Sequence, residues 1–332
     1  MYYYRKNFFK YMAYFFYKLL EKFLCLMYYV KNKRLEVMNI DNQNDGIYNL
    51  IAKELNSNDK IFKPDFNQKT GRELLAFYLQ TKFKQVLAYD KKAEIPVIID
   101  LKSDFISSFS KRLINNPQKR IMIGITGESA SGKSTICNEI TNVIKKLSLP
   151  VTIVTTDNYF KDISDLIAKY GNFDNLRDNG YDVDSPNNMQ LDVLRSDLIA
   201  ISNGEDILTP EYLINGTGIS IPKSKLVESN KIVIVEGMAT MYDGIKDIFD
   251  IKLYIETDIE IRKQRFITRA LHERNQDYDN ALKHWEYILD AGKKYIIPSR
   301  PDMDIILNGD CRLPYFSQLL EYIHTITNNF QV

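Results

Sequence analysis

The sequence predicts an α/β fold in which a mostly parallel β-sheet is covered by helices on both faces, preceded by a small helical region. Three observations predict this fold. Short apolar runs rich in β-branched residues alternate with stretches of helical periodicity. A glycine-rich segment at residues 127–134 separates one such run from a helical stretch. Carboxylates directly follow two of the runs, at Asp157 and Glu236, as expected at the carboxyl edge of a parallel sheet.

Residues 1–37 form an extension crowded with Tyr, Phe and Lys. Lys18, Glu21 and Lys22 interrupt its apolar run, which leaves no uncharged stretch of the roughly 18 residues that a spanning helix needs. A peripheral amphipathic helix is one interpretation, and membrane contact is expected only through residues 1–37. The alternative is that translation begins at Met38 and that the upstream residues are not part of the native protein.

Residues 38–119 are predicted to form the helical region, because apolar residues recur there at spacings of three and four. Asn115, Asn116 and Pro117 stop its last helix directly before an apolar strand. The α/β domain is therefore predicted to span residues 120–332. Its predicted strands are the apolar runs at 121–126, 151–156, 231–237, 251–257 and 304–309, and a long polar loop is predicted between about residues 161 and 188.

The glycine-rich segment matches the phosphate-binding pattern G-x-x-x-x-G-K-[ST], and it follows a predicted strand and precedes a predicted helix, as the motif requires. Its backbone N–H groups and the helix N-terminus attract phosphate oxygens. Lys133 is expected to reach the β- and γ-phosphates of ATP, and the Ser134 hydroxyl is expected to bind Mg²⁺. The predicted ATP-binding residues of this P-loop are Gly127, Glu128, Ser129, Ala130, Ser131, Gly132, Lys133, Ser134 and Thr135.

Composition limits which binding partners, which cellular compartment and which bound metal are expected. A formal net charge of +1 predicts no nucleic-acid partner. Cys25, Cys137 and Cys311 are far apart and form no C-x-x-C, which predicts a reducing, cytoplasmic location. The three histidines are equally scattered, so a bound metal is expected to be a hard cation held by oxygen, with Mg²⁺ as the candidate.

An arginine-rich helix is predicted near residues 259–274. Arg262, Arg265 and Arg269 share one face, and Arg274 follows. A solvated face is one interpretation, in which Glu273 pairs with Arg269 and stabilises the helix by about 0.3 kcal/mol. The alternative is that the arginines close over a transferring phosphoryl group. The guanine signature N-K-x-D of GTPases and the L-S-G-G-Q of transporters are absent from this region, which favours a kinase.

Over about residues 120–308 the chain resembles the uridine kinase and phosphoribulokinase family of P-loop kinases. The resemblance includes the P-loop, the segments TTDNYFKD, GYDVDSPNNM and KIVIVEG, the arginine helix and the closing YIIPSRPDMDIIL. It implies a P-loop NTPase fold of the nucleoside and nucleotide kinase type. It also implies ATP with Mg²⁺, a small hydroxylated acceptor and assembly as a homo-oligomer.

The resemblance implies a role for each matching residue. Asp157 matches the base that takes the proton of the acceptor hydroxyl, and Lys133 and Arg269 complete the catalytic set. Glu236, with Ser134, matches the metal-associated group. The remaining residues implied by the resemblance are Arg269 and Arg274 at the ATP phosphates, and Asp184, Tyr159 and Tyr212 at the acceptor.

The chain departs from the family mainly on the acceptor side. Thr217 stands where nucleoside kinases carry histidine, and Phe266 stands where a second arginine is usual. A nucleoside such as uridine or cytidine is the expected acceptor. A phosphorylated sugar or a pantothenate-like acceptor is the alternative, with Arg177, Lys223 or Lys225 as the additional cation, and a non-catalytic nucleotide-binding regulator is a further one.

Overall fold

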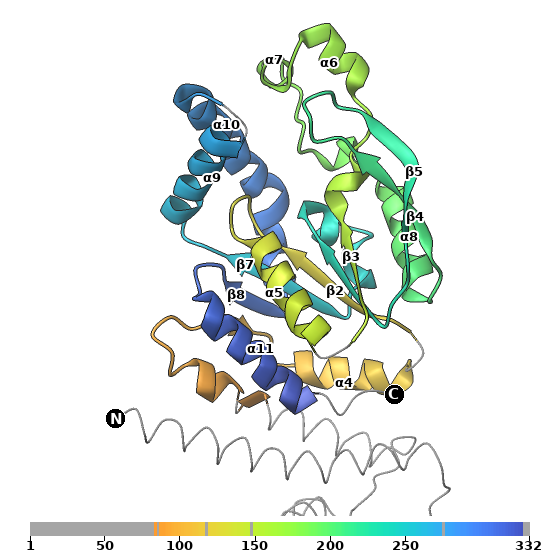
Figure 1. Ribbon diagram of the computed structural model, residues 1–332, viewed down its shortest axis with the longest axis vertical. Coiled ribbons are helices and arrows are strands. Elements are labelled where there is room, and N and C mark those ends of the chain that lie inside the picture. The colour runs from red at the N-terminus through yellow and green to blue at the C-terminus, as the bar shows by residue number, and fades with distance from the viewer. Residues whose placement is uncertain (1–82, 85, 117–118, 147–148, 274–275, 328–332) are drawn as a thin grey trace, which may run out of the picture. The chain divides into compact units, whose positions relative to one another are not determined.

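The computed structural model describes residues 83–327 except residues 85, 117–118, 147–148 and 274–275 (Figure 1). The extension at residues 1–37 and most of the predicted helical region lie outside the described residues. Residue contacts divide the chain into two units. One comprises Met1–Tyr89, Ile106–Pro117 and Leu319–Val332, and the other comprises Asp90–Phe105 and Gln118–Gln318. The second unit carries every predicted site residue, and of these Arg274 lies outside the described residues.

The first unit contains most of helix α4 (Phe105–Asn115) and the last part of helix α11 (Leu313–Thr327). Helix α4 ends at Asn115, where the sequence predicts the stop before Pro117. No helix in the described part of the chain is both long and apolar enough to cross a bilayer.

The second unit is built on a six-stranded sheet with the strand order β1-β8-β7-β2-β6-β3. All neighbours from β8 to β3 pair in parallel, and β1 pairs with β8 in the antiparallel direction. This confirms the predicted mostly parallel sheet and each predicted strand. The strands are β1 (Ile98–Leu101), β2 (Ile121–Thr126), β3 (Val151–Thr155), β6 (Ile232–Glu236), β7 (Ile251–Glu256) and β8 (Ile305–Asn308).

Strand β1 lies in the region that the sequence predicts to be helical. The carboxylate of Asp90 fixes the entry into this strand, because it accepts the backbone N–H groups of Val97 at 3.0 Å and Ile98 at 2.7 Å. The strand then completes the sheet edge beside β8. A four-residue strand is too short to be distinguished from a helical segment by periodicity alone, which is why the sequence prediction missed it.

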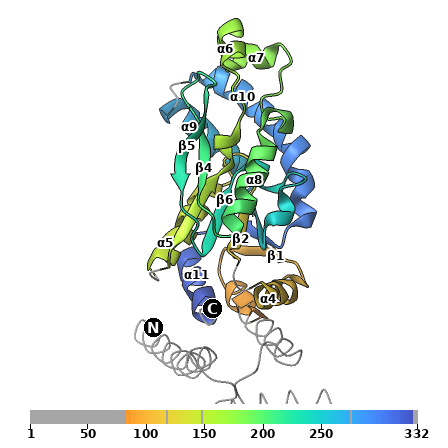
Figure 2. The ribbon, with the colours of Figure 1, turned by 90° about the vertical axis from the view of Figure 1, so that its right-hand side faces the viewer.

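Helices cover both faces of the sheet (Figures 1 and 2). On β6, Val233 and Val235 pack in one cluster with Leu194 and Leu198 of the helix α8. Ile234 lies between them and points to the opposite face, because side chains alternate along a strand. Helix α5 packs against β2, β3 and β6. The helices of this unit begin with α5 (Lys133–Lys146), α6 (Ser164–Tyr170), α7 (Phe173–Asp178) and α8 (Leu191–Ser202), and continue with α9 (Ile259–Glu273) and α10 (Tyr278–Ala291).

Short helical turns and one hairpin connect these elements. The turns are η1 (Thr156–Tyr159), η2 (Pro186–Asn188), η3 (Met238–Met241), η4 (Lys246–Ile248), the π-helical η5 (Gly292–Ile296) and η6 (Ile297–Asp302). Strands β4 (Ile207–Tyr212) and β5 (Ser220–Val227) form a separate antiparallel hairpin. The predicted turn at Asn215–Gly216 lies between them, and Gly216 has a φ of +84° that favours glycine.

The segment predicted as a long polar loop near residues 161–188 is partly helical. It contains α6 and α7, which bury Ile163, Ile167, Leu176 and Val183 in a small cluster of their own. The prediction of a loop was wrong, because Ile163, Leu166, Ile167 and Tyr170 have helical spacing over only about two turns and stand between polar residues. Each helix is only six or seven residues long, so its apolar period is barely repeated.

Candidate functional site

The P-loop, Asp157 and Glu236 lie at the carboxyl ends of three neighbouring strands. Strand β2 runs into the P-loop, and the P-loop runs into α5. Strand β3 is followed by Asp157 in η1, and β6 ends at Glu236. Because β2, β6 and β3 are adjacent and parallel, their ends meet at one edge. The sequence predicts this edge correctly as the place where these residues meet.

The P-loop is held in shape by its neighbours. Gly127 has a φ of +144°, and a Cβ there would lie 2.5 Å from the carbonyl oxygen of Ile255, so only glycine fits. The hydroxyl of Thr257 donates to the carbonyl oxygen of Ser131 at 2.8 Å. A Cβ on Gly309 would collide with the same Ser131 carbonyl oxygen. Thr257 and Gly309 are thus supports of the loop that sequence reasoning missed, and only their positions directly after β7 and β8 could have indicated them.

Lys133 folds back over the P-loop. Its Nζ donates to the carbonyl oxygens of Gly127 at 2.8 Å and Glu128 at 3.0 Å. Burial lowers the pKa of Lys133 most strongly, and the charges of Glu236 and Asp157 raise it. The ammonium is therefore placed inside the loop and in electrostatic contact with both carboxylates.

Ser134 and Glu236 present oxygen atoms to the same point. The Ser134 hydroxyl donates to Glu236 Oε2 at 3.3 Å. Burial raises the pKa of Glu236, as does the charge of Asp157, while Lys133 lowers it. A hydroxyl and a carboxylate are the donors that Mg²⁺ prefers, with phosphate oxygens and water in its other positions. These residues therefore fit Mg²⁺, although the described residues include no group of three or more His, Cys, Asp or Glu that could hold a metal by themselves.

Asp157 lies beside this pair. Burial raises the pKa of its carboxyl group, and the charge of Lys133 lowers it. Gly237 follows Glu236 with a φ of +132°, and a Cβ there would collide with Thr156 and lie 3.4 Å from Asp157 Oδ1. The close approach of these backbones brings Asp157 and Glu236 together, and Gly237 is a second glycine whose role the sequence did not reveal.

Of the predicted acceptor residues, Tyr212 ends the hairpin strand β4, and Asp184 lies in the loop between α7 and η2. Burial raises the pKa of Asp184, Arg177 lowers it, and Asp182 and Asp157 raise it. Burial also raises the pKa of Tyr212 to about 12. The Tyr212 ring lies 5.4 Å from the ring of Phe160, measured between ring centroids. The charge of Asp157 therefore reaches Asp184, which links the acceptor side to the ATP side.

Tyr159 does not line the acceptor site, contrary to the prediction. Its side chain is 0 % exposed and belongs to the main core cluster. Its hydroxyl donates to Asp197 Oδ2 at 2.9 Å, on helix α8. Tyr159 and Phe160 are consecutive and their side chains point in different directions. Tyr159 points into the core, while Phe160 contacts the Tyr212 ring.

The arginines of α9 divide into different roles. Arg262 is 3 % exposed and pairs with Glu128 of the P-loop at 2.8 Å, with its guanidinium 5.5 Å from the Trp285 ring of α10. Arg265 pairs with Asp310 at 3.0 Å. Arg269 is half-buried, and its charge is one of the influences that lower the pKa of Lys133. The helix face is therefore neither simply solvated nor directed as one group at phosphate.

The Glu128–Arg262 pair could have been suspected from the sequence. A carboxylate inside a phosphate-binding loop repels its ligand unless a cation neutralises it. The first arginine of the following arginine-rich helix supplies that cation. Arg274, predicted to contact the ATP phosphates, lies outside the described residues.

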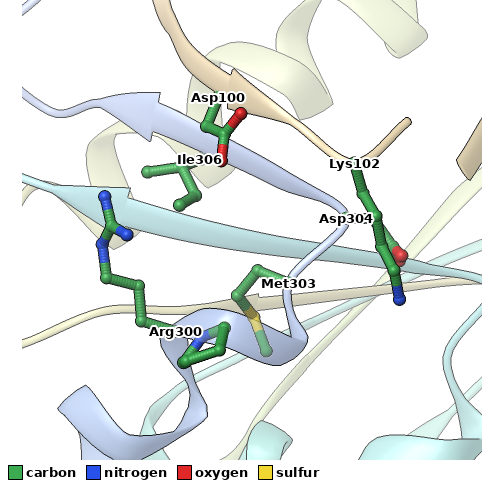
Figure 3. Close-up of a pocket in the computed structure, with 7 residues that line it drawn as sticks. Asp100, Lys102, Arg300, Met303, Asp304 and Ile306 are labelled. Carbon is green, nitrogen blue, oxygen red and sulfur yellow. The ribbon is translucent and has the colours of Figure 1, made fainter. Parts of the chain in front are cut away.

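A small hollow of about 110 Å³ lies at the amino ends of the parallel strands, opposite to the P-loop (Figure 3). Lys102, Met303, Asp304 and Ile306 line it near the start of β8, together with Asp100, Arg300 and Pro301. None of the predicted site residues lies in it. Because the P-loop is at the carboxyl edge and β8 starts at the amino edge, this hollow is separate from the candidate active site.

Comparison with known proteins shows which protein family this chain resembles. The profile of the Phosphoribulokinase / Uridine kinase family matches residues 122–311. Uridine-cytidine kinase A of Dictyostelium discoideum is 28 % identical over 229 residues, which are 67 % of this chain and 41 % of that protein. The uridine kinase of Clostridium perfringens is 31 % identical over 192 residues, which are 57 % of this chain and 88 % of that protein.

Solved structures include the phosphoribulokinase from Rhodobacter spheroides. It aligns with a TM-score of 0.42 and 15 % identity, over 57 % of this chain and 70 % of that one. The chain spans only about two fifths of the length of the first curated relatives, 41 % and 40 %.

Proposed function

Because the chain belongs to the phosphoribulokinase and uridine kinase family, we propose that it is an ATP- and Mg²⁺-dependent kinase that phosphorylates the primary hydroxyl of a nucleoside such as uridine or cytidine. One observation carries the proposal. Lys133, Asp157 and Glu236 lie so close at the end of the P-loop that the charge of each shifts the pKa of another. Such mutual perturbation of neighbouring charges is typical of catalytic sites.

Each residue then has a distinct task. Asp157 accepts the proton of the attacking hydroxyl as the general base. Lys133 exchanges the loop carbonyls for phosphate oxygens and stabilises the charge of the transferring group. Ser134 and Glu236 would hold Mg²⁺, which when bound neutralises charge on the β- and γ-phosphate oxygens. Arg269 adds a cation from helix α9, and Glu128 contributes through its backbone, because its carboxylate is paired with Arg262.

The choice of a nucleoside rests on the relatives and on the acceptor side. The relatives are named as uridine or uridine-cytidine kinases. Asp184 offers a half-buried carboxylate that suits neighbouring ribose hydroxyls, and Phe160 with Tyr212 offers aromatic surface for a planar base.

The test is ADP release by the purified full chain with ATP and Mg²⁺ across nucleosides, sugar phosphates and pantothenate. We expect turnover with uridine or cytidine and none with Lys133→Ala, which should keep the melting temperature of the wild type. Turnover only with a sugar phosphate or pantothenate would contradict the nucleoside assignment. Absence of turnover with every acceptor would contradict the kinase assignment and favour a nucleotide-binding regulator.

A further inference from the structure

Arg177 is a cation on the acceptor side for which the proposed phosphoryl transfer has no task. It lies in the last turn of α7, and its side chain is 11 % exposed. Its guanidinium pairs with Asp174 at 3.5 Å and lies 6.0 Å from the Phe173 ring and 5.7 Å from the Tyr287 ring. A guanidinium carries five N–H donors. Beyond the Asp174 pair, no described residue accepts a hydrogen bond from them, so this arginine has donors to spare.

The charge of Arg177 acts on both predicted acceptor residues. Burial raises the pKa of Asp184, and Arg177 is the strongest influence in the opposite direction. Arg177 likewise lowers the pKa of Tyr212 against the effect of burial. The guanidinium therefore lies within electrostatic reach of the residues that are expected to surround the acceptor.

Helix α10 holds this part of α7 in place. Asp178, the next residue, accepts hydrogen bonds from Lys283 Nζ at 2.6 Å and from the Tyr287 hydroxyl at 2.6 Å. The Tyr287 ring is thereby fixed, and Arg177 rests near it. Contacts with ring faces use the charge of a guanidinium and leave its N–H donors available. Arg177 is thus positioned before a ligand arrives, which reduces the entropy that binding would cost.

The surrounding charge indicates what Arg177 is suited to bind. Asp174 lies beside the guanidinium and Asp184 lies within its field, so one cation is outnumbered by two carboxylates. An anionic acceptor group would be repelled here, whereas a neutral carbonyl would not. The pair of rings, Phe160 and Tyr212, favours a planar partner. A guanidinium can donate its N–H groups to a carbonyl oxygen of a pyrimidine base.

The hairpin tip offers no competing donor at Thr217. Its hydroxyl donates to Asn215 Oδ1 at 2.5 Å, and its backbone N–H donates to the same oxygen at 3.1 Å. The Tyr181 hydroxyl is also engaged, because it donates to Asn188 Oδ1 at 2.5 Å. Thr217 and Tyr181 are therefore already engaged, whereas Arg177 keeps N–H donors available.

We propose that Arg177 binds the carbonyl edge of a pyrimidine ring on the acceptor and is a specificity-determining residue of the reaction proposed above, on which this inference rests. The alternative is that Arg177 only positions Asp184, and so acts on the sugar. The two roles differ in one respect. A contact with the base matters only for an acceptor that carries a base.

The test compares uridine with methyl β-D-ribofuranoside, which has the same ribose and no base. In Arg177→Gln we expect kcat/KM for uridine to fall about 10- to 100-fold, as for loss of a hydrogen bond to a charged group, with the KM for ATP unchanged. The value for the riboside should change less than about threefold. Arg177→Lys should recover only part of the loss, because an ammonium does not stack beside the Phe173 and Tyr287 rings as a planar guanidinium does. Arg312→Gln removes an exposed arginine paired with Glu94 and should match the wild type throughout.

Calorimetric titration of uridine into the full chain separates this inference from the proposed function. Uridine binding without turnover, weakened at least tenfold in Arg177→Gln, would support the inference while contradicting the kinase assignment. Turnover of uridine with equal values for wild type and Arg177→Gln would overturn the inference and leave the kinase assignment standing. Equal losses for uridine and the riboside would overturn it in favour of a positioning role. Absence of uridine binding to the wild type would overturn it as well.

Discussion

The ion pair between Glu128 and Arg262 allows a prediction that separates stability from ATP binding. Arg262 is 3 % exposed and Glu128 is 18 % exposed, with 2.8 Å between the charged atoms. Removing one partner of a buried pair leaves an uncompensated charge and costs about 3–5 kcal/mol. Because Glu128 retains some access to water, we expect the lower end, about 3 kcal/mol, for Arg262→Gln. For a unit of this size that corresponds to a fall in melting temperature of roughly 6–12 °C.

The two single variants should differ in ATP binding. Arg262→Gln leaves an unpaired carboxylate inside the P-loop, so the KM for ATP should rise. Glu128→Gln leaves no such carboxylate, so it should lose stability while keeping the KM for ATP near that of the wild type. The double variant Glu128→Gln/Arg262→Gln should recover both properties, because no buried charge remains.

The assay is thermal unfolding of the four proteins together with ATP titration of their ADP release. Arg312→Gln breaks an exposed pair, with side chains 65 % and 74 % exposed, and should cost less than about 1 kcal/mol. Additive losses of stability in the double variant would refute the reasoning, because independent residues show no coupling. An unchanged KM for ATP in Arg262→Gln would refute the role given to Glu128.

Three further predictions concern Asp157 and Glu236, the carboxylates of the proposed reaction. Asp157→Asn should lower kcat about 10²–10⁴-fold with little change in ATP binding, measured by nucleotide titration, and an unchanged kcat would place the base elsewhere. Glu236→Gln should weaken the apparent affinity for Mg²⁺ about 10–100-fold, measured by varying free Mg²⁺ at fixed ATP, and equal Mg²⁺ dependence would remove Glu236 from the metal site. Burial raises the pKa of Asp157, and a base acts only when ionised, so kcat/KM for the acceptor should fall as pH decreases through a value above the usual 3.9 or so. Because Asp157 and Glu236 interact, this acid limb belongs to the pair, and a limb at or below about pH 4 would contradict it.

The ATP side could be predicted from the sequence because local patterns determine it. The P-loop pattern lies between a strand and a helix, and Asp157 and Glu236 follow strands whose ends must meet in a parallel sheet. The location of these residues in the fold therefore follows from their position along the backbone alone. Their long-range supports, Thr257 and Gly309, are invisible to such patterns because they contact the loop only after folding.

The acceptor side was harder to predict because side-chain direction decides it. Tyr159 and Phe160 are adjacent aromatics, and nothing in their local sequence shows which one enters the core. The arginines of α9 present a similar problem. Their spacing places Arg262 and Arg265 on one face, but Glu128 and Asp310, which pair with them, lie more than forty residues away in sequence.

The central claim is that the residues at the end of the P-loop transfer the γ-phosphoryl group of ATP to a nucleoside hydroxyl. It is tested most directly by following ³²P from γ-labelled ATP with uridine or 5′-deoxyuridine, which lacks the accepting hydroxyl. We predict label in a nucleotide product with uridine, none with 5′-deoxyuridine, and at least a hundredfold slower transfer in Asp157→Asn. Label that appears only as inorganic phosphate, at the same rate with either compound or neither, would contradict the claim.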